Sequence, residues 1–255
     1  MTFTAPFIAP SAHEALSASP AIPAAAPGAL VDRLNAVLPQ TQCTRCGYPD
    51  CRAYAEAITS GQAAINRCPP GGAEGIQRLA HLTGLPVLAL DLSCGPEVPR
   101  LLAVIDEAWC IGCTLCLKVC PVDSITGANK LMHTVIDDLC TGCELCVPAC
   151  PVDCIALVPV TPGRTGWQAW SAAQADEAQQ RYAFHQLRQA RDLLENDDRL
   201  ASRAATKLAD LPAHTQHTDP AVLDHKRAVI AAALARARAR KATIKTDGSP
   251  ADPRP

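Results

Sequence analysis

Fourteen cysteines are the residues of this 255-residue chain whose type and spacing could do chemistry. Eight of them form two runs with the spacing C-x2-C-x2-C-x3-C-P, at residues 110–121 and 140–151. This spacing is typical of bacterial ferredoxins with two [4Fe–4S] clusters, in which the fourth cysteine of each run ligates the other cluster. It predicts one cluster on Cys110, Cys113, Cys116 and Cys150, and another on Cys120, Cys140, Cys143 and Cys146.

A third group of four cysteines precedes these runs, at Cys43, Cys46, Cys51 and Cys68. Four thiolates can complete a [4Fe–4S] cluster, but this spacing is not unique to clusters, and a structural zinc site is the alternative. Zinc is a poor match for the two later runs, because zinc sites usually combine two C-x2-C pairs separated by a longer spacer. The expected cofactors are therefore three [4Fe–4S] clusters, with twelve cysteines as the metal-binding residues and no catalytic residue.

The remaining conspicuous residues near these cysteines are expected to be structural. Cys154 should pack as a small apolar side chain, and Cys94 should be an ordinary free cysteine. Trp109 should pack against the fold rather than carry electrons, and His133 should be a surface or packed histidine rather than a ligand. An apolar shell that excludes water from the clusters is expected from Ile111, Leu115, Ile125, Val135, Ile136 and Ile155.

The elements that position the cysteines are indicated by an internal repeat. Residues 110–125 (CIGCTLCLKVCPVDSI) match residues 140–155 (CTGCELCVPACPVDCI), so one supersecondary unit is used twice. We expect an α+β fold in which a small helical cluster domain precedes a two-cluster ferredoxin-like domain and a helical C-terminal tail. The expected boundaries are 1–28 for a disordered Ala/Pro-rich N-terminus, 29–84 for the first cluster domain, 85–100 for a linker, 101–163 for the ferredoxin domain and 164–255 for a partly disordered basic tail.

The distribution of charge along the chain indicates which partners the tail could contact. Residues 1–163 carry 8 Lys and Arg against 14 Asp and Glu, whereas residues 164–255 carry 15 against 11. The basic stretch 225–245 is expected either to face solvent or to contact an acidic partner or an anionic membrane surface. Nucleic acid is not expected as a partner, because no aromatic platform accompanies these charges.

Several classes of protein are disfavoured by missing patterns. The chain shows no secretory signal and no apolar run of about 20 residues, which favours a cytoplasmic protein with reduced thiols. It also lacks a dinucleotide fingerprint, a P-loop and a nucleophile elbow. An electron-carrying subunit is therefore expected rather than an independent enzyme.

Four segments carry a resemblance to a known family. Residues 42–51 (QCTRCGYPDC), 65–72 (INRCPPGG), 109–116 (WCIGCTLC) and 132–136 (MHTVI) resemble the B subunit of the Rnf/Rsx electron-transport complex. All twelve grouped cysteines fall on motif positions, and the resemblance implies that the first group also binds a [4Fe–4S] cluster. It further implies a relay subunit in a membrane complex that couples electron flow between ferredoxin and NAD to ion translocation.

The resemblance also implies partners and a location. The partners would be other subunits of an Rnf-type complex, a ferredoxin or a reductase, met at the cytoplasmic face of the inner membrane. The family's usual N-terminal membrane helix has no counterpart in the Ala/Pro-rich N-terminus, and the tail lies outside the shared motifs. A free soluble polyferredoxin that serves another oxidoreductase is therefore the alternative, and a zinc-stabilised interaction module is a third possibility.

Overall fold

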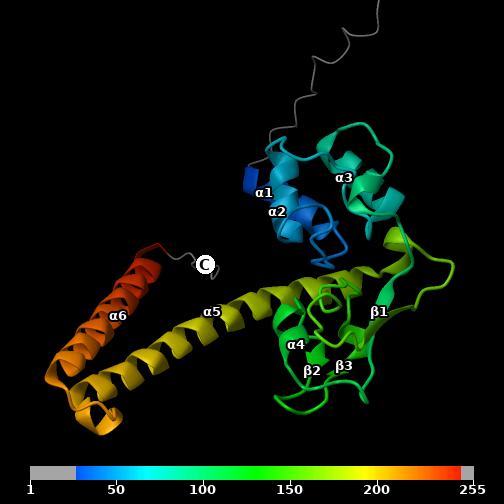
Figure 1. The fold of residues 1–255 in the computed structure, drawn as a ribbon. Helices are drawn as coiled ribbons and strands as arrows, with labels where there is room; N and C mark the ends of the chain where they lie inside the picture. The colour runs from blue at the N-terminus through cyan, green and yellow to red at the C-terminus, as the bar shows by residue number, and fades with distance from the viewer. Residues whose placement is uncertain (1–26, 248–255) are drawn as a thin grey trace, which may run out of the picture. The chain divides into compact units, whose positions relative to one another are not determined.

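The computed structural model describes residues 27–247. The N-terminal segment expected to be disordered lies outside the described residues up to residue 26, as do the last eight residues of the tail. Within the chain, contacts separate a first unit that ends at Tyr182 from a second unit that begins at Ala183 (Figure 1). Both cysteine-bearing regions belong to the first unit.

The first cysteine group is carried by a small helical region. Its helices are α1 (Pro27–Ala36), α2 (Cys51–Thr59) and α3 (Gly72–Thr83), and they share one apolar core that includes Leu34, Tyr54 and Leu79. Helix α2 begins at a cysteine because Asp50 caps it: its Oδ1 accepts a hydrogen bond of 2.7 Å from the backbone N–H of Ala53. The cap fixes the start of α2, and with it the position of Cys51.

The ferredoxin-like region is built from two short sheets. Its elements are β1 (Leu101–Ile105), α4 (Leu115–Val119), β2 (Ile125–Thr126), β3 (Thr134–Val135), the 3-10 turn η2 (Asp137–Leu139) and β4 (Ile155–Pro159). Strand β1 pairs antiparallel with β4, and β2 pairs antiparallel with β3. Each sheet therefore takes one strand from each half of the repeat, which interlocks the two halves.

A segment beyond the ferredoxin region also belongs to the first unit. Two 3-10 turns, η1 (Leu92–Cys94) and η3 (Gly166–Ala169), flank the region. At η3, the indole Nε1 of Trp167 donates to the carbonyl of Val37 at 2.9 Å, and the Arg78 guanidinium lies 4.1 Å from the ring. Arg181 donates to the carbonyl of Val122 at 2.7 Å. Residues 164–182, which were expected to belong to the tail, are held to the first unit by these contacts.

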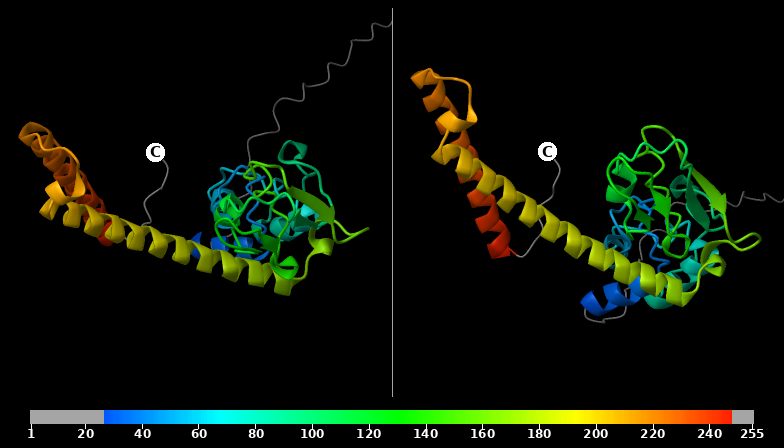
Figure 2. Two further views of the ribbon diagram at one scale, coloured as in Figure 1. Left: turned by 60° about the horizontal axis from the view of Figure 1, so that its bottom comes forward. Right: turned by 90° about the horizontal axis from the view of Figure 1, so that it is seen from below.

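The C-terminal region is helical, as predicted. Helix α5 (Ala172–Ala209) begins in the first unit, and the second unit contains its remainder, the turn η4 (Pro212–His214) and α6 (Pro220–Asp247). Figure 2 shows α6 turning back from the end of α5. Within residues 27–247, no helix combines the length and the apolar character needed to cross a membrane.

Candidate iron–sulfur sites

The backbone of the repeat turns in the same way twice. A residue on each side of the second cysteine, and one after the Cys-Pro pair, has a left-handed φ in both halves. These angles are 68°, 64° and 50° at Gly112, Thr114 and Asp123, and 63°, 69° and 50° at Gly142, Glu144 and Asp153. Alternating left-handed residues turn successive N–H groups towards one centre, which makes an anion-binding concavity of the kind found at iron–sulfur sites.

The fold brings the cysteines of the repeat into two cavities. One cavity of about 270 Å³ is lined by Cys110, Cys113, Cys116 and Cys150, which we call the Cys110 quartet. The other, of about 310 Å³, is lined by Cys120, Cys140, Cys143 and Cys146, which we call the Cys140 quartet. In each cavity three cysteines come from one half of the repeat and the fourth from the other half, which is the grouping expected from the spacing.

The first cysteine group lines a third cavity, of about 300 Å³. Cys43, Cys46, Cys51 and Cys68, which we call the Cys43 quartet, all face it. The residues on either side of Cys43 have left-handed φ angles, 53° at Gln42 and 59° at Thr44. Cys43 therefore lies in a loop with the same alternation as the loops around Cys113 and Cys143, although no glycine marks the position of Gln42.

A buried chain of side-chain amides holds the loop of the Cys43 quartet. Gln42 Nε2 donates to Gln40 Oε1 at 2.9 Å, and Gln40 Nε2 in turn donates to the carbonyl and side chain of Asn35 at the end of α1. At the other end, Gln42 Oε1 accepts the N–H of Cys51 at 2.9 Å. All three amide side chains are buried, so each bond replaces a lost contact with water and links the loop to α1 and α2.

Tyr54 positions the fourth cysteine of this quartet. Its hydroxyl donates to the carbonyl of Ala64 at 2.9 Å and accepts the N–H of Arg67 at 3.1 Å. Burial raises the pKa of this phenol, so it remains a neutral donor. Since Arg67 immediately precedes Cys68, the bond from α2 brings the returning chain back to the cavity.

The donor set of each cavity suits an iron–sulfur cluster. Each of the three cavities is lined by four of the grouped cysteines. Four thiolates are the ligands of a [4Fe–4S] cluster. The residues therefore fit a multi-iron group.

Burial holds several thiols of the quartets in their neutral form. Burial raises the pKa of Cys116 to about 11 and the pKa values of Cys143 and Cys146 to about 12, and it also raises the pKa of Cys51. Metal ligation needs thiolates, so loading must displace protons from these groups.

Three further side chains contact the sulfurs, and the sequence pattern predicted this role for none of them. His133 is buried, with its Nδ1 3.4 Å from Cys116 Sγ. The hydroxyl of Ser124 lies 3.2 Å from Cys120 Sγ, and the thiol of Cys154 lies 3.4 Å from Cys150 Sγ. The expected packing of Cys154 and His133 holds, but both side chains also face the Cys110 cavity. For Ser124 and Cys154 a sequence signal existed, because the two residues occupy equivalent positions of the repeat.

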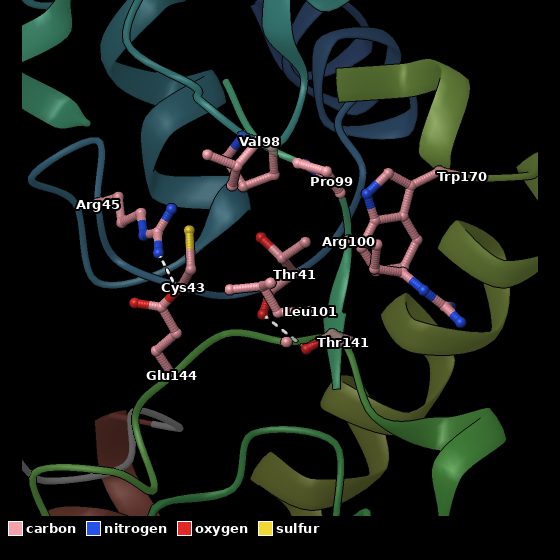
Figure 3. Close-up of a pocket in the computed structure, with 12 residues that line it drawn as sticks. Thr41, Cys43, Arg45, Val98, Pro99, Arg100, Leu101, Thr141, Glu144 and Trp170 are labelled. Atoms are coloured by element: carbon pink, nitrogen blue, oxygen red, sulfur yellow. Dashed lines mark hydrogen bonds and ion pairs between the residues drawn. The ribbon is translucent and has the colours of Figure 1, made fainter. Parts of the chain in front are cut away.

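The Cys43 and Cys140 loops touch each other. Arg45 forms an ion pair with Glu144, and the hydroxyl of Thr141 donates to the carbonyl of Thr41 at 3.1 Å. Figure 3 shows these contacts beside a pocket of about 380 Å³ whose lining also includes Cys43. The contacts join the loop of the first quartet to the loop of the second.

Part of the expected apolar shell is exposed to solvent. Ile125 and Ile155 are buried and Val135 packs against the same core, as predicted. Ile111, Leu115 and Ile136 were expected to shield the clusters but are exposed. The expectation for Trp109 was also wrong, because 69% of its surface is exposed. These residues lie on turns or on the short helix α4, and within residues 27–247 they remain exposed. Of the four, only Ile111 lines one of the three cysteine cavities.

Cys94 belongs to none of the three quartets. It is buried in η1, and its thiol lies 3.9 Å from Asp91 Oδ2. It lines none of the three cysteine cavities. Cys94 forms no disulfide, and its role as an ordinary free cysteine stays a prediction.

Comparisons with known proteins agree with this geometry. The family model described as "4Fe-4S dicluster domain" matches residues 103–157, and the one described as "Putative Fe-S cluster" matches residues 38–70. The B subunit of the ion-translocating oxidoreductase complex of Azoarcus sp. (strain BH72) is 60% identical over 139 residues, which are 54% of this chain and 76% of that protein. The protein of the same name from Thiobacillus denitrificans is 56% identical over 139 residues, which are 54% of this chain and 74% of that protein. The one from Alkalilimnicola ehrlichii is 55% identical over 156 residues, which are 60% of this chain and 83% of that protein.

No solved structure matches the chain. The two family models, which both describe iron–sulfur clusters, together match parts of both cysteine-bearing regions. The chain therefore belongs to the family of B subunits of ion-translocating oxidoreductase complexes, which are iron–sulfur electron-transfer subunits.

Proposed function

We propose that this chain relays electrons through three [4Fe–4S] clusters, one on each cysteine quartet. The observation that carries the proposal is that three separate cavities are each lined by four of the twelve grouped cysteines. A cluster bound by each quartet would supply a one-electron redox centre. No acid–base residue is needed, which fits a carrier rather than an independent enzyme.

The loop contacts support an order for the relay. The Cys43 loop touches the Cys140 loop through the Arg45–Glu144 pair and the Thr141 hydrogen bond. The Cys140 and Cys110 quartets exchange Cys120 and Cys150 across the repeat. The Cys140 quartet is therefore the middle site, and the Cys43 and Cys110 quartets are the two ends.

The surface near the Cys110 end supports electron exchange with a protein partner. Trp109 and Ile111 flank the first ligand of this quartet and are exposed. Exposed apolar side chains grouped beside a site are typical of a contact surface. The partners proposed are the other subunits of an ion-translocating oxidoreductase complex, a ferredoxin or a reductase.

The location follows from the partners. A subunit of such a complex would lie at the cytoplasmic face of the inner membrane, where thiols stay reduced. The basic stretch of α6, with Arg227, Arg236 and Arg238, could then face anionic headgroups. This contact is proposed from charge alone.

Iron and acid-labile sulfide analysis of anaerobically prepared chain tests the cofactor count. We expect about twelve of each per chain, from three four-iron clusters. Cys51→Ser should lose about four of each and Cys94→Ser should lose none, since Cys94 lines none of the three cavities. A value of about eight for the parent chain would remove the Cys43 quartet from the relay, and a colourless zinc protein would overturn the proposal.

A further inference from the structure

The two cavities of the repeat differ in what touches the crossing cysteine. In both halves, the N–H of the residue four positions after that cysteine approaches its sulfur, at 3.2 Å from Ser124 to Cys120 and at 3.4 Å from Cys154 to Cys150. This backbone contact is thus present in both halves. The side chain at the position differs, because it is a hydroxyl in one half and a thiol in the other.

The side chain adds a second contact to the same sulfur. Ser124 Oγ lies 3.2 Å from Cys120 Sγ, and Cys154 Sγ lies 3.4 Å from Cys150 Sγ. Ser124 and Cys154 are both buried, so water does not compete for either contact. A hydroxyl is a good donor, whereas a thiol is a weak one.

Donors to a ligand sulfur favour the reduced form of an iron–sulfur site. One-electron reduction adds negative charge that is shared by the sulfurs, and a hydrogen bond stabilises that charge more in the reduced form than in the oxidised form. The donor keeps its proton in this step, and no bond is made or broken. The stronger donor therefore raises the reduction potential more than the weaker one.

We propose that Ser124 and Cys154 adjust the reduction potentials of the two repeat sites, with Ser124 raising the potential of the Cys140 quartet and Cys154 holding that of the Cys110 quartet lower than serine would. Both residues act through a ligand sulfur. The inference rests on the proposed function, since it needs clusters on these quartets. The difference between the Ser124 hydroxyl and the Cys154 thiol then favours the reduced form of the Cys140 quartet, which is the middle site of the relay.

The two cavities also differ in other polar residues. Thr141 and Glu144 line the Cys140 cavity, and His133 lines the Cys110 cavity. His133 approaches Cys116 in the Cys110 cavity, while the corresponding position in the repeat, Ala103, lines the Cys140 cavity with a methyl group. The absolute order of the two potentials therefore depends on more than Ser124 and Cys154. For this reason each variant is compared with the same site in the parent chain.

The test is an EPR-monitored redox titration of the full chain with dithionite, on protein whose iron and sulfide have been counted. Ser124→Ala should make reduction of one site about tenfold less favourable, which is about 59 mV for a one-electron couple. Cys154→Ser should make reduction of a different site about threefold to tenfold more favourable. Cys154→Ala and Ser124→Cys are the matched variants at the same two positions. Each should lower the reduction potential of the site that it contacts.

The outcomes separate the possibilities. Unchanged potentials in Ser124→Ala and Cys154→Ser, with full iron and sulfide, would overturn the inference while leaving the relay intact. Loss of iron in both Cys154→Ala and Cys154→Ser would also overturn it, because Cys154 would then be a ligand. If one variant fails to fold, the other substitution at the same position tests the inference. A parent chain without clusters would instead overturn the proposed function.

Discussion

Gly142 should be far less tolerant of a side chain than its backbone angle alone implies. It lies between Cys140 and Cys143 with a φ of 63°. A Cβ there would overlap the carbonyl oxygen of Leu101 and would lie 3.0 Å from the carbonyl carbon of the same residue. Leu101 is held in β1 by its pairing with β4, so it cannot move away without disturbing the sheet.

The loss of folding stability expected for Gly142→Ala has two parts. Placing alanine in the left-handed region costs about 1–2 kcal/mol. Overlap with a packed backbone adds about 1–3 kcal/mol. Gly163→Ala is the matched control, because Gly163 has a φ of 73° and no atom within 4 Å of the added Cβ. It should show only the first part.

The assay is thermal unfolding combined with iron analysis. For a chain of this size 1 kcal/mol corresponds to about 2–4 °C in the midpoint, so Gly163→Ala should lower it by about 2–8 °C. Gly142→Ala should lower it about twice as much and should lose about four irons, those of the Cys140 quartet. Equal midpoints and equal iron contents in the two variants would refute the reasoning.

Three other outcomes are expected. Gln42→Ala should weaken the Cys43 quartet by about 1–3 kcal/mol because it leaves the partly buried N–H of Cys51 without its acceptor. Iron retention during chelation should therefore fall relative to an exposed Gln62→Ala control. Breaking the Arg45–Glu144 pair by Arg45→Ala should cost at most about 1 kcal/mol, since the two side chains are 24% and 33% exposed; a double-mutant cycle with Glu144→Ala measures it, and a coupling several times larger would contradict this. Thiols such as Cys143 have a pKa of about 12 in the folded chain against an ordinary 9.0, so the cluster-free chain should lose stability as the pH rises from about 9 to about 12, and a thermal midpoint that rises across this window would be the contrary result.

The cysteine pattern was the part of the fold most open to prediction. Two runs closed by Cys-Pro at a fixed period require interlocked halves, because the fourth cysteine of each run cannot reach its own site. The structure groups the twelve cysteines in the same three sets. The helical character of the regions on either side also followed from periodicity.

The sequence could not predict contacts between segments that are distant along the chain. Trp109 was expected to pack because tryptophan usually does, yet within the described residues 27–247 its side chain remains exposed. The contact of Ser124 with a ligand sulfur arises only when the chain turns back after the Cys-Pro pair. Trp167 was expected in the tail because no motif extends to it, although its indole donates to the carbonyl of Val37, just after α1.

The central claim is that one chain holds three redox-active iron–sulfur sites, and EPR spin quantitation of the fully reduced chain tests it most directly. We predict about three spins per chain, with broadening from magnetic interaction between neighbouring clusters. Cys51→Ser should leave about two spins, which identifies the contribution of the Cys43 quartet. A parent chain that already gives about two spins, or none in a colourless zinc-loaded protein, would contradict the three-site relay.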